Sequence, residues 1–313
     1  MITARAAPVA KARRGHRGRL FFLAFDHRQS FAREMLGTSL VDADSAKRLQ
    51  EAKRVVFDGL LLAAGSGEVM SEEVALMIDE RFGGEIPGLA RQRGMPVAVA
   101  VERSGQEIFE FEYGDDFEAH IERTDPDFSK VLVRLNPAGE RAGERLQLDR
   151  LKLLGDLLQH HGRGFLFELL VPPTAEQLSE AGNIHTYEIE MRPGLIENAM
   201  ARIQAHGIEP DVWKVEGIDS LAAAARVAAQ ARAEERWADV SCTVLGAGAP
   251  DERVRSWLGV AARTEGYEGF AIGRSIWRDS LRLYLDGDLD REAVSAEVAR
   301  RYLDFARVYA EAE

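Results

Sequence analysis

Short runs of apolar residues, rich in β-branched and aromatic side chains, recur along the chain from residue 20 onward. Each run ends in polar residues or glycine, and a longer segment with apolar residues at helical spacing follows it. Eight segments fit this description: LFFLAFD (20–26), VVFDGLLLA (55–63), MPVAVAVE (95–102), KVLVRLN (130–136), GFLFELLV (164–171), DVWKVEG (211–217), DVSCTVLG (239–246) and GFAIGRSIW (269–277). Near-continuous apolar strands that alternate with helices are typical of a parallel sheet covered by helices. Eight such units predict an α/β protein of the (β/α)8 TIM-barrel class.

Two of the intervening segments carry clear helix signals. Pro193 lies in the first turn of a predicted helix that stops at Gly207, and Asp219 or Ser220 can cap the alanine-rich helix 221–233. An open, doubly wound sheet is the competing fold. It predicts a glycine-rich phosphate turn after the first strand, and the segment FDHRQSF holds none.

Composition narrows the class of protein. The chain has 313 residues, 46% of them hydrophobic, which suits one large domain. The net charge of −12 argues against a general nucleic-acid or anionic-membrane binder, although one site can still be locally basic. Cys242 is the only cysteine, so we expect no internal disulfide and a cytoplasmic setting. No apolar run approaches the ~20 residues that span a bilayer.

Residues 1–19 stand apart because they hold several arginines and no acidic residue. We expect a flexible tail there, with an electrostatic handle for RNA or a partner as the alternative. The catalytic barrel domain is then expected to span 20–313. Such barrels commonly form homo-oligomers, but nothing in the sequence locates an interface.

In a barrel, functional side chains lie where the strands end at the carboxyl face. The period of two along 211–217 places Lys214 on the inward face and Trp213 on the face that meets the helices. The same rule turns Arg134 and Asn136 inward from the fourth run and Asp26 inward from the first. A lysine, an arginine and an aspartate can therefore converge.

A buried lysine has a specific chemical use. Its neutral amine attacks a ketone and forms a Schiff base, which acts as an electron sink for cleavage of a carbon–carbon bond. Burial and a nearby cation such as Arg134 would lower the pKa of Lys214 toward neutrality. The base is left open among four carboxylates: Asp26, Glu102, Glu168 and Glu216. The competing interpretation is a structural ion pair of Lys214 with Glu216 or Glu168.

The ends of the last two strands predict an anion site. Gly246, Gly248 and Gly273 follow strands, and Arg274 stands next to the last of them. Glycines let backbone N–H groups approach an anion, and these loops commonly bind phosphate in barrels. The alternative is that glycine-rich strand ends are common in any barrel.

Metal catalysis is the rival mechanism. Of the seven histidines only His27, His120 and His185 could reach the carboxyl face, and neither an HxH nor an HExxH spacing occurs. A carboxylate-only Mg²⁺ site built from Asp26, Glu102 and Glu168 stays open.

Several segments together resemble the 5-dehydro-2-deoxyphosphogluconate aldolase family of myo-inositol breakdown: FLAFDHRQSF, FDGLL, KVLVRLNP, FLFELLVPPT, MRP, EPDVWKVEGID, VRSWL and GFAIGRSIWRDSL. The resemblance covers about residues 20–311 and implies the stand-alone form of a domain often fused to 5-dehydro-2-deoxygluconokinase. More distantly the chain is similar to lysine-dependent tagatose-bisphosphate and sulfofructose-phosphate aldolases, also barrels. Those relatives imply a Schiff-base role for Lys214 and a matching strand-one aspartate in Asp26.

The resemblance also implies a phosphate near Gly246, Gly248, Gly273 and Arg274. Many members carry arginine in an LGRG stretch where this chain has Ala247, which points to a different anion, a neutral substrate, or compensation by Arg192. His27, Asn136 and Glu216 are further candidates for substrate contacts.

The sequence therefore predicts a metal-independent class I aldolase without a cofactor, acting on a small sugar phosphate. The expected reaction cleaves 6-phospho-5-dehydro-2-deoxy-D-gluconate to glycerone phosphate and malonate semialdehyde. Lys214 would form the iminium, Asp26 would position or deprotonate the substrate with Glu168 or Glu102 as alternates, and Arg134 would tune the lysine or hold a substrate oxygen. The alternatives are an aldolase for another phosphorylated or sulfonated ketose and a non-catalytic barrel that binds a sugar phosphate.

Overall fold

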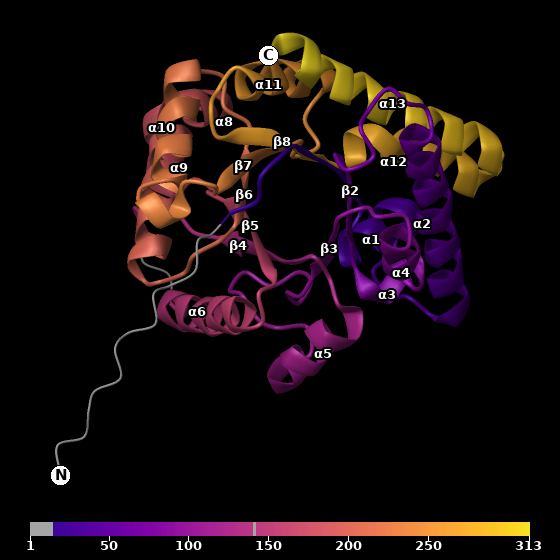
Figure 1. Ribbon diagram of the computed structural model, residues 1–313, viewed down its shortest axis with the longest axis horizontal. Coiled ribbons are helices and arrows are strands. Elements are labelled where there is room, and N and C mark those ends of the chain that lie inside the picture. Colours follow the sequence, from indigo (N-terminus) through magenta and orange to yellow (C-terminus); the bar gives the residue numbers. More distant parts are fainter. Residues whose placement is uncertain (1–14, 140–141) are drawn as a thin grey trace.

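The computed structural model describes residues 15–139 and 142–313. Eight parallel strands close into a barrel in the order of the sequence, and helices form a ring around it (Figure 1). The strands are β1 Leu20–Ala24, β2 Val74–Ile78, β3 Val97–Ala100, β4 Phe128–Arg134, β5 Gly164–Leu170, β6 Val212–Glu216, β7 Ser241–Leu245 and β8 Tyr267–Ile272. The predicted TIM-barrel architecture is confirmed.

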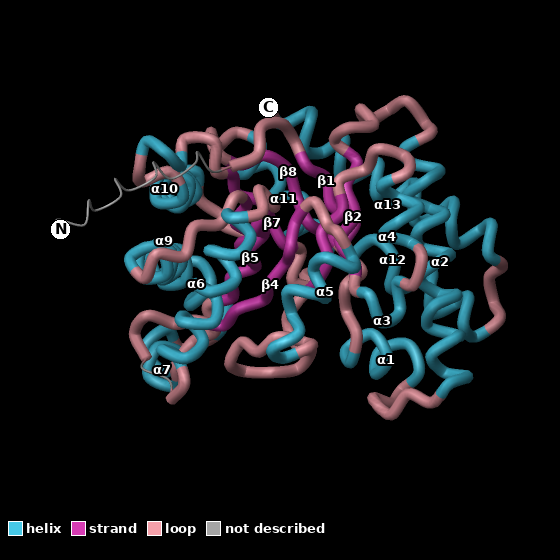
Figure 2. The backbone as a smooth tube through the Cα atoms, turned by 60° about the horizontal axis from the view of Figure 1, so that its bottom comes forward, coloured by secondary structure: helices cyan, strands magenta, loops and turns pink. Residues whose placement is uncertain are grey.

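Figure 2 shows the helices as an outer layer around the strands. They are α1 Gln29–Leu36, α2 Ala43–Ala64, α3 Glu80–Gly83, α4 Ile86–Arg91, α5 Phe117–Thr124, α6 Glu144–His160, α7 Ala175–Ala181, α8 Ile184–Thr186, α9 Arg192–Ala205, α10 Leu221–Ala231, α11 Asp251–Ala262, α12 Arg274–Asp286 and α13 Arg291–Ala312. Pro193 lies in the first turn of α9, and the Ser220 side chain caps α10, as the sequence predicts. None of the described helices has the length and apolarity that a membrane span requires.

The second strand was predicted in the wrong place. Residues 55–63 form the second half of α2. Its N-cap is Asp42, whose side chain accepts a hydrogen bond from the Ser45 N–H. The true β2, with the sequence VALMI, is fully buried. A short continuous apolar run does not distinguish a buried strand from a buried helix face, which is why the prediction failed here. The run 269–277 was also too long, because α12 begins at Arg274.

Helices α2 and α13 pack side by side in the ring of helices around the barrel (Figure 1). Ser295 on α13 donates to the Val55 carbonyl at 3.0 Å. Gly59 allows the close approach, because a Cβ there would lie 2.6 Å from the Val298 side chain. This contact fixes α2, whose Lys53 supports the candidate site described below.

Alternation along the strands sorts the core into two layers. Side chains such as Phe21, Leu23 and Trp213 pack outward against the helices in the larger cluster. A second cluster fills the barrel interior, and its members are Leu20, Phe22, Ala24, Ala75, Met77, Ala98, Phe128, Leu166, Val212 and Ala271. These apolar side chains fill much of the barrel interior, and the charged side chains described below lie at the carboxyl end of the strands.

The two long strand-to-helix connections differ in their role. Residues 103–127 include α5 and line part of the pocket described below. Phe111 in this segment forms an antiparallel bridge with Glu102, just before it. Residues 172–190 contain α7 and α8 and contribute nothing to that pocket.

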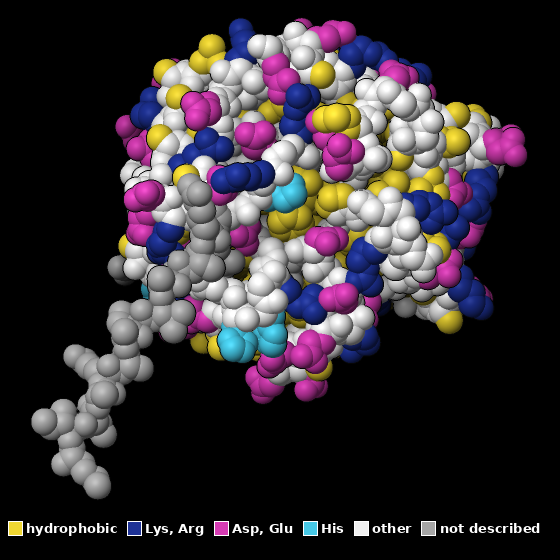
Figure 3. All heavy atoms as spheres, viewed as in Figure 1, with side chains coloured by type: hydrophobic (Ala, Val, Ile, Leu, Met, Phe, Trp, Pro, Cys, Tyr) yellow, Lys and Arg dark blue, Asp and Glu magenta, His cyan; other side chains and the backbone are white. Residues whose placement is uncertain are grey.

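The predicted basic tail lies largely outside the described residues, which begin at residue 15. Its last part, residues 15–19, is held against the barrel: the Gly15 N–H donates to Asp211 at 2.9 Å, and Arg17 pairs with Asp239. Lys, Arg, Asp and Glu side chains intermingle on the face seen in Figure 3, and hydrophobic side chains gather at the centre of the ring. That face therefore offers no broad patch of a single charge.

Candidate functional site

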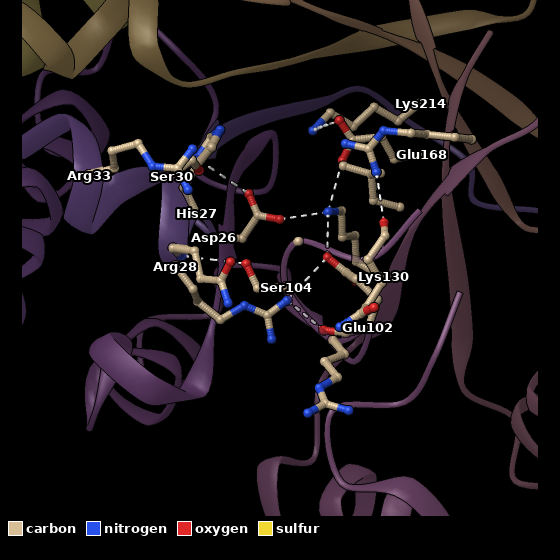
Figure 4. Close-up of a pocket in the computed structure, with 16 residues that line it drawn as sticks. Asp26, His27, Arg28, Ser30, Arg33, Glu102, Ser104, Lys130, Glu168 and Lys214 are labelled. Atoms are coloured by element: carbon tan, nitrogen blue, oxygen red, sulfur yellow. Dashed lines mark hydrogen bonds and ion pairs between the residues drawn. The ribbon is translucent and has the colours of Figure 1, made fainter. Parts of the chain in front are cut away.

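A pocket of about 340 Å³ lies at the carboxyl ends of the strands (Figure 4). Its lining comes from residues 26–30 and Arg33 after β1, residues 102–106 after β3, Lys130, Leu132 and Arg134 on β4, Glu168 on β5 and Lys214 on β6. Nothing from the loops after β7 and β8 belongs to this lining. The pocket is therefore asymmetric and extends toward the β1, β3 and β4 side.

A buried lysine that sequence reasoning missed, Lys130, forms the centre of the site. Its Nζ lies 2.7 Å from Asp26 Oδ2, 3.0 Å from Glu102 Oε1 and 2.9 Å from Glu168 Oε2. Figure 4 shows the three carboxylates approaching it from different sides. Burial alone would lower the pKa of Lys130, but the three carboxylates outweigh it and hold that pKa well above its usual value. Lys130 is therefore a fixed positive charge.

The sequence did contain the signal for Lys130. The predicted strand began at Lys130 itself, which made this residue look like an exposed strand start, whereas β4 begins at Phe128. Extending the inward series of Arg134 and Leu132 by one further step of two reaches Lys130.

Lys214 lies inside the barrel, as the alternation on β6 predicts. Its Nζ lies 3.0 Å from Glu168 Oε1 and 3.5 Å from the Met77 sulfur, and the residue is only 4% exposed. Glu168 is its one carboxylate partner within 4.0 Å among the described residues, and the amine borders the pocket. This amine therefore combines one anionic contact with an open cavity beside it.

Two of the three carboxylates remain ionised because of the lysines. Burial opposes the charge of Asp26, but Lys130, His27 and Lys214 overcome it and bring the pKa of Asp26 well below its ordinary value. Glu168 is also buried, and Lys130 and Lys214 together lower its pKa. Both groups accept hydrogen bonds and carry negative charge at neutral pH.

Glu102 behaves differently. Burial raises its pKa despite Lys130 and Arg28, and its Oε2 atom is buried without a hydrogen-bond partner among the described residues. Arg28 donates to the Glu102 backbone carbonyl at 2.5 Å and pairs with Glu112 at 3.2 Å. This arginine therefore ties the end of β3 and its loop to the end of β1.

His27 lines the pocket beside Asp26, with 3.8 Å between its Nδ1 and Asp26 Oδ1. Burial lowers the pKa of His27 to about 4, although Asp26 acts in the opposite direction. The imidazole is consequently neutral at pH 7. Of the three histidines that the sequence placed near the carboxyl face, only His27 lines the pocket; His120 is paired with Glu80 at 2.6 Å.

Arg134 borders the pocket from the end of β4, as expected. It donates to the Gln106 carbonyl at 3.2 Å and has no carboxylate partner among the described residues. Asn136 does not line the pocket. Its amide donates to Pro172 at 2.8 Å and to Gln177 at 2.6 Å, which anchors the loop after β5.

Glu216 and Arg192 pair with each other away from the pocket lining. Arg192 lies 3.3 Å from Glu216 Oε1, and Glu216 Oε2 accepts from the Val171 N–H at 2.9 Å. Neither residue is therefore free to hold a substrate in the pocket.

The loops after β7 and β8, where the sequence predicts a phosphate, make close contacts with other parts of the protein. Arg274 donates to the Ala247 carbonyl at 3.0 Å, and its guanidinium lies so near Gly248 that a Cβ there would be 2.9 Å from its central carbon. Gly273 makes room for β1, since a Cβ there would lie 2.0 Å from the Ala24 carbonyl oxygen. Gly246, Gly248, Gly273 and Arg274 do not line the pocket, so an anion site at these loops stays a prediction that lies outside it.

The three carboxylates suggested as Mg²⁺ ligands, Asp26, Glu102 and Glu168, do converge, but on an ammonium group. Lys130 takes the central position, and Lys214 and Arg28 supply two more positive charges. Three carboxylates and three cations give a floor that is electrically balanced when every group is ionised. Among the described residues, no group of three or more His, Cys, Asp and Glu side chains has the arrangement of a metal site.

Comparisons with known proteins locate the chain in a family and a fold. The pattern of the family described as "Uncharacterized protein conserved in bacteria (DUF2090)" matches residues 7–313. No curated protein matches the sequence. Among solved structures, Cgl0159 from Corynebacterium glutamicum (Brevibacterium flavum) is similar with a TM-score of 0.56 and 17% identity, over 93% of this chain and 89% of that one. At that identity the likeness extends to the fold alone.

Proposed function

The chain belongs to the DUF2090 family of proteins conserved in bacteria, and from the pocket we propose that it is a class I aldolase that forms a Schiff base on Lys214. The observation that carries this proposal is the contrast between two buried lysines in one cavity. Lys130 is held by three carboxylates, whereas Lys214 has one and borders open space. A lysine attacks a carbonyl through a free amine, and Lys214 is the one whose amine has open space beside it.

Glu168 is the proton acceptor nearest to Lys214. Its Oε1 atom lies 3.0 Å from the amine, so the proton moves along an existing contact. Lys130 and Lys214 lower the pKa of Glu168 against the effect of burial, so a loss of charge on Lys214 makes this carboxylate a better proton acceptor. The protonated Glu168 then returns its proton to the hydroxyl of the carbinolamine, which leaves as water and yields the iminium.

Cleavage requires a base for the hydroxyl on the carbon beta to the iminium. Asp26 and Glu168 approach Lys130 from different sides in Figure 4, and we assign Asp26 this role, with Glu102 as the alternative. The hydroxyl proton goes to the carboxylate, the aldehyde leaves, and the electron pair enters the iminium to give an enamine. The Lys130 ammonium stabilises the negative charge that develops on the hydroxyl oxygen.

The expected substrate is 6-phospho-5-dehydro-2-deoxy-D-gluconate, and this assignment is supported by the resemblance of the sequence motifs. The products would be glycerone phosphate and malonate semialdehyde. An aldolase for another phosphorylated or sulfonated ketose uses the same lysine and the same carboxylates. A barrel that only binds a sugar phosphate would need no reactive amine beside its cavity.

Borohydride trapping tests the proposal. Glycerone phosphate and borohydride should add mass to the peptide that holds Lys214 in the wild-type protein. The adduct should be absent in Lys214→Met and present, at a lower rate, in Lys130→Met. Retro-aldol release of glycerone phosphate, followed with and without EDTA, gives the activity. An adduct confined to Lys130, or turnover that survives in Lys214→Met, would overturn the assignment.

A further inference from the structure

The cations around the pocket fall into two groups. Those at the floor, Lys130, Lys214 and Arg28, each contact a carboxylate. Those at the wall and rim are Arg33, Arg103 and Arg134. Arg103 lies 3.4 Å from Glu110, but Arg33 and Arg134 have no carboxylate within 4.0 Å among the described residues. Two arginines of an acidic protein thus keep unneutralised charge on the wall of one cavity.

Arg134 is the more confined of the two. It is half-buried, on the same inward face of β4 as Lys130, and its protein hydrogen-bond acceptor in the described part of the chain is the Gln106 carbonyl. Four residues of strand separate the two Cα atoms by about 13 Å. A guanidinium presents a planar fork that suits carboxylate and phosphate oxygens. Arg33, Ser30 and Ser104 add a cation and two hydroxyl donors to the same lining.

The shape of the pocket sets which part of a substrate meets these groups. Lys214 holds the carbonyl carbon at the β6 side, and the cavity extends from there toward the β1, β3 and β4 loops. A substrate attached to Lys214 therefore extends toward Arg33 and Arg134. On the other side Arg274 fills the glycine turn after β7, as its contact with Ala247 shows.

We infer that Arg33 and Arg134 form an anion subsite for the half of the substrate that leaves as the aldehyde, so that this aldehyde carries a carboxylate or a phosphate. The inference rests on the proposed Schiff-base function, because Lys214 defines the orientation of the substrate. It makes Arg33 and Arg134 specificity-determining residues for the aldehyde product.

Synthesis in the aldol direction measures this directly. Glycerone phosphate is combined with 3-oxopropanoate, glyceraldehyde 3-phosphate or neutral glyceraldehyde, and kcat/KM is determined for each. Wild type should favour at least one anionic aldehyde over the neutral one by about tenfold or more, and the better of the two anions identifies the group. Arg134→Gln and Arg33→Gln should lose about 10- to 100-fold on the anionic aldehyde and under about twofold on the neutral one. Arg48→Gln, on the exposed face of α2, is the matched control.

Binding of malonate and inorganic phosphate, measured by titration calorimetry, needs no turnover. Either anion should bind wild type, and its affinity should fall at least about tenfold in Arg134→Gln but not in Arg48→Gln. Trapping on Lys214 without any preference for anionic aldehydes would overturn the subsite alone. Loss of trapping in wild type would instead overturn the proposed function. An equal loss on anionic and neutral aldehydes would show that the arginines support structure rather than specificity.

Discussion

Lys214 and Lys130 bind opposite oxygens of one carboxylate: Lys214 lies 3.0 Å from Glu168 Oε1, and Lys130 lies 2.9 Å from Glu168 Oε2. The shared carboxylate couples the two amines, yet their surroundings separate their chemistry. Asp26 and Glu102 complete a cage of anions around Lys130. Within the described part of the chain, the other contact of the Lys214 amine is with the neutral thioether of Met77. Lys130 is therefore enclosed by anions while Lys214 borders the open cavity, and this difference in surroundings underlies the proposed mechanism.

The first prediction concerns Lys130→Met. Removing the cation leaves three buried carboxylates without their common partner, which should cost about 3–5 kcal/mol of unfolding free energy at pH 7. Without the ammonium, burial raises the pKa of all three carboxyl groups above their unfolded values. Such groups destabilise the fold increasingly as pH rises above about 4. The loss of unfolding free energy in Lys130→Met relative to wild type, measured by urea denaturation, should therefore be smaller at pH 5 than at pH 7.

Lys152→Met is the control for that experiment, because Lys152 forms an exposed pair with Asp156 on α6. It should change stability by less than about 1 kcal/mol. A deficit for Lys130→Met that is the same at both pH values would contradict the caged arrangement.

The second prediction uses the raised pKa of Glu102, which burial causes. A carboxyl group of this kind favours the folded state below its unfolded pKa and loses that contribution as pH rises through its folded pKa. Glu102→Gln removes the titrating group. The free energy of unfolding of the variant, relative to that of wild type, should therefore increase from pH 5 to pH 8. Urea midpoints at the two pH values measure the change.

For Asp26→Asn we expect the opposite pH dependence of stability. The pKa of Asp26 is depressed by Lys130 against the effect of burial, so its contribution is present above about pH 4 and lost as pH falls. The Asn variant should be less stable than wild type at pH 7, and the gap should narrow in acid. If the stabilities of the two variants relative to wild type changed with pH in the same direction, the contrast between a raised pKa for Glu102 and a lowered pKa for Asp26 would be refuted.

Period-two alternation was sufficient to predict much of this molecule. It placed Lys214 inside the barrel with Trp213 outside, and it brought Asp26 and Arg134 to the same pocket. It missed Lys130 because a strand boundary was set two residues late. The start of β4 depends on its pairing with β5, a segment more than 30 residues away in the sequence. The first pair of residues between the two strands is Phe128 and Gly164.

The phosphate loops show what sequence spacing cannot supply. The sequence does not tell whether a glycine after a strand makes room for an anion or for a neighbouring segment of the protein. Only the three-dimensional arrangement shows Ala24 against Gly273 and Arg274 against Gly248. The wrongly predicted second strand also depends on tertiary contacts. Residues 55–63 form part of α2, which packs against α13, and Ser295 on α13 donates to the Val55 carbonyl.

The third prediction concerns a buried ion pair beneath the site. Lys53 on α2 is fully buried, forms a short contact with Asp79, and donates to the backbone carbonyls of Phe25 at 2.5 Å and His27 at 3.0 Å. These carbonyls flank Asp26, so Lys53 fixes the end of β1. Lys53→Met should lower the unfolding free energy by about 3–5 kcal/mol, because it leaves the Asp79 carboxylate buried and unpaired.

The double variant Lys53→Met/Asp79→Asn removes the orphaned charge and should recover part of that loss. Thermal or urea unfolding of the single and double variants forms a cycle that measures the coupling. Strict additivity of the two substitutions would mean that the pair contributes no interaction energy. Slower borohydride trapping in the double variant, at restored stability, would show that Lys53 also positions Asp26.

The last prediction decides between two explanations for Gly273. If its role is close packing, a Cβ must displace the Ala24 carbonyl, which also accepts a hydrogen bond from Trp277 at 3.0 Å. Gly273→Ala should then lower stability by about 1–3 kcal/mol. Gly259→Ala is the matched control, because Gly259 lies inside α11 and a Cβ added there would meet nothing within 4 Å, so this change should raise stability by about 0.5–1 kcal/mol. If Gly273 instead binds a phosphate, Gly273→Ala would raise KM for the phosphorylated substrate and leave the urea midpoint unchanged, and that result would restore the anion site after β8.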